Sequence, residues 1–228
     1  MANLSNINNK FIVTDGGQAL VNQTVAGFNP DADDLIVGNL SGNTGITIAS
    51  GSSAGNYGSI YFADAAGSST ASKAGYIRYE QNTSKMTIGI NAVEKVAIDL
   101  SGNVGIGVTP SSWEIISDSN ALQFYGSYIY NYRDTNLILG NNAYYDGTWK
   151  YYKSSIGATK FNSGNGAFDF AVSSSGTANN AITWIEALKI DSSGEVRALR
   201  PRSNTVGDIA LSVDPGDTVV RYGWRVDQ

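Results

Sequence analysis

The sequence contains neither cysteine nor histidine. Without cysteine the chain forms no disulfide and no thiolate site. Without histidine it has no imidazole for a Ser-His-Asp triad, for acid–base catalysis or for metal ligation. Enzymes that depend on those side chains are excluded. We expect a protein that is not an enzyme, with no catalytic residue, no cofactor and no metal site.

Charged residues are also scarce. They make up 15% of the chain, against roughly 25% in an average domain, and the net charge is −5. The chain therefore lacks the basic surface that binds nucleic acid or anionic membranes. It has no run of 18 apolar residues, so we expect no membrane insertion. The N-terminus, MANLSNINNKF, lacks the regions of a signal peptide, which predicts synthesis in a cytosol.

Glycine outnumbers proline by 26 to 4, and 42% of the residues are hydrophobic. Glycine turns with Ser, Thr and Asn as the polar residues favour strands over surface helices. The predicted fold class is all-β with little helix, built from short antiparallel strands and hairpins in β-sandwich or β-prism-like modules. One short helix is expected over 110–121, where a proline stands near a helical first turn.

Alternating apolar residues between glycine turns predict the strands. They are expected at 11–14, 35–37, 46–48, 60–63, 76–79, 86–90, 93–100, 122–132, 137–139, 149–153 and 167–173, whereas 182–190 fits a strand or a short helix. A C-terminal hairpin is expected within 203–228, around the turn Asp214-Pro215-Gly216-Asp217.

A glycine-containing motif recurs in the chain. LSGNTGI at 40–46 matches LSGNVGI at 100–106 in all but one position, and IDSSGEV at 190–196 matches IDLSGNV at 98–104 at five of seven. A phosphate-binding loop requires a lysine after its last glycine, and the stretch LSGNVGIGVTP at 100–110 has none. The order of its glycines also differs from that of the dinucleotide-binding fingerprint. We interpret the motif as a hairpin turn that places glycine at positive φ.

Acidic residues cluster at Asp31, Asp33 and Asp34. An EF-type calcium loop would need glycine at its sixth position and glutamate at its twelfth, where this chain has Ile36 and Gly42. A solvated turn fits better. A glycosidase pair formed by two distant carboxylates stays open, because sequence does not show which acids meet.

Aromatic residues concentrate between residues 124 and 152. Aromatic rings beside amides and carboxylates suit sugar rings, which stack on one face and use their hydroxyls at the edge. Alternating tyrosines also pack in a β core or a subunit interface, and we favour that interpretation. The candidate glycan-binding residues are Tyr128, Tyr130, Tyr132, Tyr144, Tyr145, Trp149 and Tyr151.

Two regions resemble modules of bacteriophage tail fibres. The first comprises GSIYF at 58–62, GYIRY at 75–79, MTI at 86–88 and AID at 97–99, which runs into LSGNVGIGVTP. The second runs from WKYY at 149–152 to ALKIDSSG at 187–194. Together they span about residues 58–200. The resemblance implies a virion structural protein that is an intertwined homotrimer and attaches the particle to the host surface.

On this resemblance we expect four regions: an attachment region at 1–34, a β-repeat module at 35–110, an aromatic-rich β module at 111–202 and the hairpin at 203–228. The expected partners are further copies of the chain, tail or capsid proteins bound through the N-terminal region, and a host surface glycan. The expected location is the virion, assembled in the host cytoplasm and exposed on the extracellular particle. Two alternatives stay open: a capsid decoration or head-fibre protein without a receptor role, and a glycan-degrading tailspike.

Overall fold

The structure is a computed structural model that describes residues 3–7, 11–14, 19–21, 35–38, 42–67, 70–114 and 118–198. It comprises two compact units, 1–49 and 50–228. The described part of the first unit is a four-stranded sheet in the order β1-β2-β3-β4, with β3 and β4 parallel. Its strands are β1 (Asn3–Ile7), β2 (Phe11–Thr14), β3 (Ala19–Val21) and β4 (Leu35–Val37).

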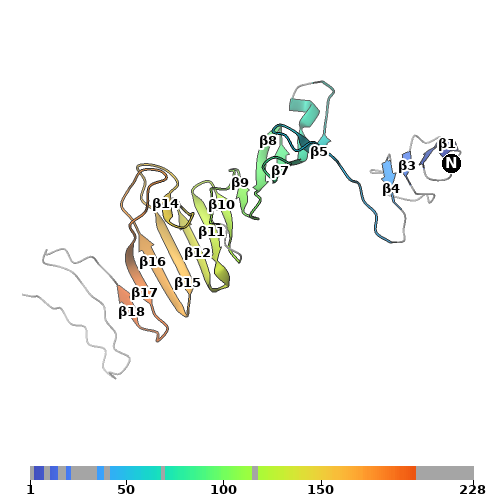
Figure 1. The fold of residues 1–228 in the computed structure, drawn as a ribbon. Helices are drawn as coiled ribbons and strands as arrows, with labels where there is room; N and C mark the ends of the chain where they lie inside the picture. Colours follow the sequence, from blue (N-terminus) through green and yellow to red (C-terminus); the bar gives the residue numbers. More distant parts are fainter. Residues whose placement is uncertain are drawn as a thin grey trace, which may run out of the picture. The chain divides into compact units, whose positions relative to one another are not determined.

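The second unit is dominated by a twelve-stranded sheet in which sequence neighbours pair side by side, from β5 at one edge to β18 at the other (Figure 1). Its strands are β5 (Tyr57–Phe62), β6 (Gly75–Glu80), β7 (Lys85–Ile90), β8 (Val93–Ile98), β9 (Val104–Ile106), β10 (Asn120–Phe124), β11 (Ser127–Tyr132), β12 (Asn136–Asn141), β15 (Thr159–Gly164), β16 (Ala167–Val172), β17 (Ile185–Ile190) and β18 (Val196–Ala198). Two 3-10 turns, η1 (Thr70–Lys73) and η2 (Arg133–Thr135), accompany them.

The sheet departs from a simple meander at two places. β9 and β10 pair in parallel, so the chain crosses over one face of the sheet between them. After β12 the chain leaves the sheet to form a separate hairpin of β13 (Ala143–Tyr145) and β14 (Trp149–Tyr151), and it returns as β15 beside β12. Side chains from both segments cover one face of the sheet. Trp113 from the crossover and Tyr144 from the hairpin belong to the buried hydrophobic cluster there.

The two faces of the sheet differ sharply in composition. Side chains alternate along each strand, and residues paired in register point to the same side. One row of paired residues crosses eleven strands, and we call it the apolar ladder: Tyr79, Met86, Ile98, Val104, Leu122, Ile129, Leu139, Phe161, Phe170, Leu188 and Ala198. The face that carries this ladder is the apolar face.

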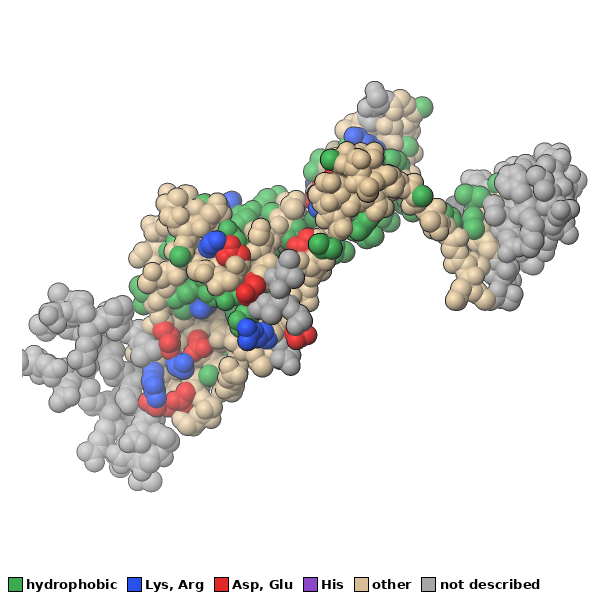
Figure 2. Space-filling model, viewed as in Figure 1, with side chains coloured by type: hydrophobic (Ala, Val, Ile, Leu, Met, Phe, Trp, Pro, Cys, Tyr) green, Lys and Arg blue, Asp and Glu red, His purple; other side chains and the backbone are tan. Residues whose placement is uncertain are grey.

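The opposite face, which we call the tyrosine face, carries the strand charges. Every charged strand residue of this sheet that has a register partner points there: Arg78, Glu80, Lys85, Glu94, Lys160, Asp169, Glu186, Lys189 and Arg197. Figure 2 shows charged side chains gathered towards the β17–β18 end of the sheet, while hydrophobic side chains are visible along the rest of it. The segregation leaves the apolar face without a charged strand residue in register.

The recurring motif forms the turn that its sequence predicts. In the copy at 98–104, Gly102 has φ +83° and Asp99 accepts hydrogen bonds from the amides of Ser101 and Asn103, each at 2.9 Å. In the copy at 190–196, Gly194 has φ +87° and Asp191 accepts from the amide of Ser193 at 3.0 Å. Glycine reaches this left-handed conformation without a Cβ clash. The hairpin-turn interpretation is confirmed for both copies.

The all-β fold class is confirmed. Most predicted strands are present, and 182–190 contains a strand, β17. The helix expected over 110–121 is wrong, because the described residues 110–114 are irregular and β10 begins at Asn120. The strand expected at 46–48 is also absent. The segment 122–132 is two strands, because the chain turns at Tyr125, where φ is +51°.

Two predictions concern residues that the structure does not describe, and one concerns a module boundary. The acidic turn at 31–34 and the C-terminal hairpin within 203–228 lie outside the described residues. The boundary expected between 110 and 111 coincides with no break in the sheet, since β9 pairs with β10. Among the described residues, no helix is long and apolar enough to cross a membrane.

Candidate functional site

The candidate glycan-binding residues meet in one aromatic cluster on the tyrosine face. Strand alternation places Tyr128 and Tyr130 on the same side of β11, and Trp113 from the crossover lies against both, with ring centres 5.3 Å and 4.8 Å away. The β13–β14 hairpin closes the cluster from above, because Trp149 lies 5.6 Å from Tyr128. The structure therefore brings together the residues that the sequence singles out.

The rings pack mainly against one another. Tyr128, Tyr130, Tyr144 and Tyr151 expose between 0% and 8% of their surface, and Tyr132, Tyr145 and Trp149 are half-buried. A sugar ring stacks on a free aromatic face, and the four buried tyrosines offer none in this conformation. The core-packing interpretation of these four residues follows from their burial.

Burial also controls the ionisation of the cluster. Removal from water disfavours a phenolate, so burial raises the pKa of Tyr130 to about 12 and raises that of Tyr128 well above its ordinary value. The Tyr144 hydroxyl donates to Asn179 Oδ1 at 2.9 Å, and the Tyr151 hydroxyl donates to the Ser174 carbonyl at 2.8 Å. The cluster is thus a neutral, closely packed core at any physiological pH.

Gln123 fastens the crossover to this core, and its side chain exposes only 1% of its surface. Its Oε1 accepts from the Ser111 amide at 2.8 Å and from Trp113 Nε1 at 3.0 Å. Its Nε2 donates to Ser111 Oγ at 3.1 Å and to the Tyr125 carbonyl at 2.7 Å. A buried amide with this many partners fixes one arrangement of the chain around it.

Asn142 plays the same part for the β13–β14 hairpin. It exposes 2% of its surface. Its Oδ1 accepts from the Lys153 amide at 2.7 Å, and its Nδ2 donates to the Ile156 carbonyl at 2.8 Å. Sequence reasoning missed both amides, because a single Gln or Asn between strands carries no periodic signal.

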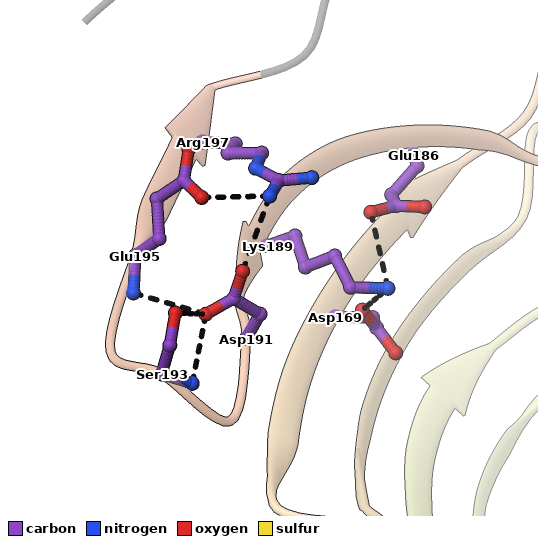
Figure 3. Close-up of polar contacts among 7 residues, drawn as sticks. All are labelled: Asp169, Glu186, Lys189, Asp191, Ser193, Glu195 and Arg197. Carbon is purple, nitrogen blue, oxygen red and sulfur yellow. Dashed lines mark hydrogen bonds and ion pairs between the residues drawn. The ribbon is translucent and has the colours of Figure 1, made fainter. Parts of the chain in front are cut away.

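A ladder of charges crosses the tyrosine face beyond the aromatic cluster (Figure 3). Lys189 Nζ lies 3.2 Å from Asp169 and 3.8 Å from Glu186, while Arg197 lies 3.2 Å from Asp191 and 2.7 Å from Glu195. The hydrogen bond from the Ser193 side chain, with smaller contributions from backbone amides and Arg197, holds the pKa of Asp191 below its usual value.

This ladder does not resemble a glycosidase pair. A general acid needs a carboxyl whose pKa is raised by an apolar site or by a like charge. Each of these four carboxylates instead lies within ion-pair distance of a lysine or arginine on the polar surface of the sheet. Among the described residues, no three His, Cys, Asp or Glu side chains group closely enough to hold a metal ion.

Lys160 links the charge ladder to the aromatic cluster. Its Nζ lies 4.7 Å from the ring centre of Trp184 and 5.3 Å from that of Trp149, and burial lowers its pKa. A lysine at this distance over two indoles is stabilised by the ring quadrupoles. Lys160 therefore packs its ammonium group against both tryptophans on this face of the sheet.

An open hollow of about 420 Å³ lies beside the hairpin. Its lining is rich in small hydroxyl and amide side chains from the segment between β16 and β17: Ser174, Ser175, Gly176, Thr177, Asn180, Ala181 and Thr183, with Tyr151 and Ile185. Exposed hydroxyls and amides next to an aromatic edge can exchange hydrogen bonds with a hydroxyl-rich ligand. Of the seven predicted residues only Tyr151 lines this hollow.

The apolar face contrasts with all of these features, because no side chains from the described residues close over it as the hairpin closes over the tyrosine face. Sixteen large apolar side chains on it expose between 38% (Ile129 and Leu139) and 62% (Ile90) of their surface, while others, such as Leu122 and Phe161, are half-buried. Comparison of the chain with protein-family models, with curated proteins and with solved structures found no match.

Proposed function

We propose that the chain is a structural protein of the phage virion, a tail fibre or a similar fibre that acts as a homotrimer and attaches the particle to the host surface. The proposal rests on the resemblance of its modules to those of tail fibres. The observation that carries it is the shape of the second unit, a long sheet built by stepwise addition of short strands.

A stepwise sheet suits a fibre. Each strand pairs mainly with its neighbours in sequence, so the body extends in one direction as hairpins are added. The Asp-x-Ser-Gly turns at Asp99 and Asp191 end two of these steps in the same way. A recurring turn between strands lets such a body vary in length without a new fold.

We place the contact with the host on the loops at the tyrosine face. The hollow lined by Ser174, Thr177 and Asn180 offers hydroxyl and amide groups to a surface glycan. The aromatic cluster beneath it acts as the rigid support, since Tyr151 donates to the Ser174 carbonyl. Loops on a rigid scaffold are where binding residues concentrate.

The position of the chain on the particle tests the proposal. Antibodies raised against the purified chain are bound to intact virions that contain it and located by electron microscopy. Label on the tail or on fibres that project from it supports the proposal. Label spread over the capsid favours the decoration protein, and loss of host polysaccharide in the presence of the purified chain favours the tailspike. Either of these results overturns the proposal.

A further inference from the structure

The apolar face of the twelve-stranded sheet is a second functional surface, distinct from the hollow and the charge ladder. We infer that this face is the interface between copies of the chain, with the apolar faces of all copies turned towards one another around a common axis. The inference rests on the proposed function for the number of copies and goes beyond it by assigning the contact surface.

The exposed apolar side chains of this face indicate that another protein layer packs against it. Sixteen of its large apolar side chains, from Ile60 in β5 to Val196 in β18, each expose more than a third of their surface. A set of this size presents on the order of 1,000 Å² of apolar surface, above the few hundred Å² of the largest patch on a typical monomer. It also exceeds the ~800 Å² that each partner buries in a standard interface.

The pattern within the face is that of an interface. The central row is the apolar ladder. The rows beside it mix apolar residues with uncharged polar ones, among them Asn120, Ser127, Asn131, Asn141, Thr159 and Ser163. An apolar centre with a polar margin is the usual anatomy of a protein–protein contact, and it differs from the surface of a chain that stays monomeric.

The absence of charge on the apolar face indicates which partner packs against it. A different protein is ordinarily steered to its site by complementary charge, and no charged strand residue with a register partner points to this face. The partner must also be apolar over the same length of twelve strands. Another copy of this face meets both conditions, and its Asn and Ser side chains can serve as donors and acceptors to their own equivalents.

Burial of the face also explains why the sheet needs no second layer in one chain. A sheet with one face apolar must bury that face against another layer. The described residues supply a layer only to the tyrosine face, through Trp113 and the β13–β14 hairpin. The second layer on the apolar face is then another chain, and the oligomer is obligate.

Cysteine labelling tests the assignment, because the natural chain has no cysteine. Leu139→Cys places a thiol on the apolar ladder, and Phe170→Cys provides a second position should the first fold poorly. Glu186→Cys is the matched control on the tyrosine face, where the Glu186 side chain is 41% exposed. Each full-length variant is treated with a maleimide, and labelling is followed by mass spectrometry alongside the mass of the assembly.

The expected result is an oligomer in which Cys labelling at positions 139 and 170 is slower than at position 186 by about tenfold or more, until denaturant dissociates the assembly. Equal labelling in an intact oligomer overturns the assigned face and leaves the fibre proposal standing. A monomer in which position 139 is protected shows that the chain covers its own face, which also overturns the inference. The position of the chain on the virion is measured separately, so the two proposals fail by different results.

Discussion

Leu139 in β12 lies directly opposite Ile129 in β11, and each leaves 38% of its surface exposed. In a finished core two such neighbours would both be buried. Exposed apolar side chains also occur on other strands of this face, among them Met86 in β7 and Phe170 in β16, so the exposure is not confined to one strand. The described residues pack the tyrosine face into a core, whereas they leave the apolar face partly exposed.

The tyrosine cluster makes the fold sensitive to alkali. A tyrosine whose folded pKa is raised contributes stability that is full below the unfolded pKa near 10 and is lost as pH rises through the folded value. Burial raises the pKa of Tyr130 to about 12. We expect unfolding stability to fall between about pH 10 and pH 12. Phenolate absorbance should rise in two stages, with the buried tyrosines ionising together with unfolding measured by circular dichroism. Ionisation of every tyrosine near pH 10 in the folded state would contradict this.

Two buried tyrosines should respond differently to loss of the hydroxyl. Tyr144 donates to Asn179, so Tyr144→Phe leaves the Asn179 oxygen without that donor and should cost about 1–2 kcal/mol. The buried Tyr128 hydroxyl has no hydrogen-bond partner among the described residues, so Tyr128→Phe should be neutral or stabilise by about 1 kcal/mol. Denaturant unfolding of the two variants measures the difference. Equal losses would show that Tyr128 has a partner in solution.

Gln123→Leu should be strongly destabilising. The variant keeps the volume but removes the acceptor of Trp113 Nε1 and of the Ser111 amide. Buried donors left without partners cost about 1–3 kcal/mol each, so we expect a loss of about 2–5 kcal/mol in unfolding free energy. Thr83→Ala removes one exposed hydrogen bond, to Glu80, and should cost under about 1 kcal/mol. A similar small loss for both variants would contradict the anchoring role of Gln123.

Much of the strand pattern could be predicted from the sequence. β2 and β4 have the predicted bounds, and the Asp-x-Ser-Gly turns have the predicted geometry, because strand alternation and glycine turns are local signals. The helix over 110–121 failed for a tertiary reason. The Ser111 amide is bonded to Gln123 and the Glu114 amide to the Tyr145 carbonyl, so contacts distant in sequence take the groups that a helix would use.

The division between the two faces was not predicted, although its elements were. Register decides which residues share a face, and register depends on turns such as the one at Tyr125, where a bulky residue takes a positive φ. β15 was missed because its alternation of Lys160, Phe161 and Asn162 is half polar. The candidate sugar-binding tyrosines were recognised as a group, but only the β13–β14 hairpin, which leaves the sheet, shows that they are covered.

Gly89→Ala tests the packing of a tyrosine across two strands. Tyr76 lies opposite Gly89, and a Cβ on Gly89 would clash with the Tyr76 ring. The ring must move, which should cost about 1–3 kcal/mol. Gly45→Ala is the control, since nothing lies within 4 Å of its Cβ position, and it should change stability by less than about 0.5 kcal/mol. Equal effects of the two alanines in thermal unfolding would show that Tyr76 does not lie over Gly89.

The most direct test of the central claim is the mass of the full-length chain in solution by multi-angle light scattering. If the apolar face lies between the copies of a homotrimer, the chain forms a single species of three times the chain mass of 24.1 kDa, unchanged on dilution. A species of 24.1 kDa would contradict it.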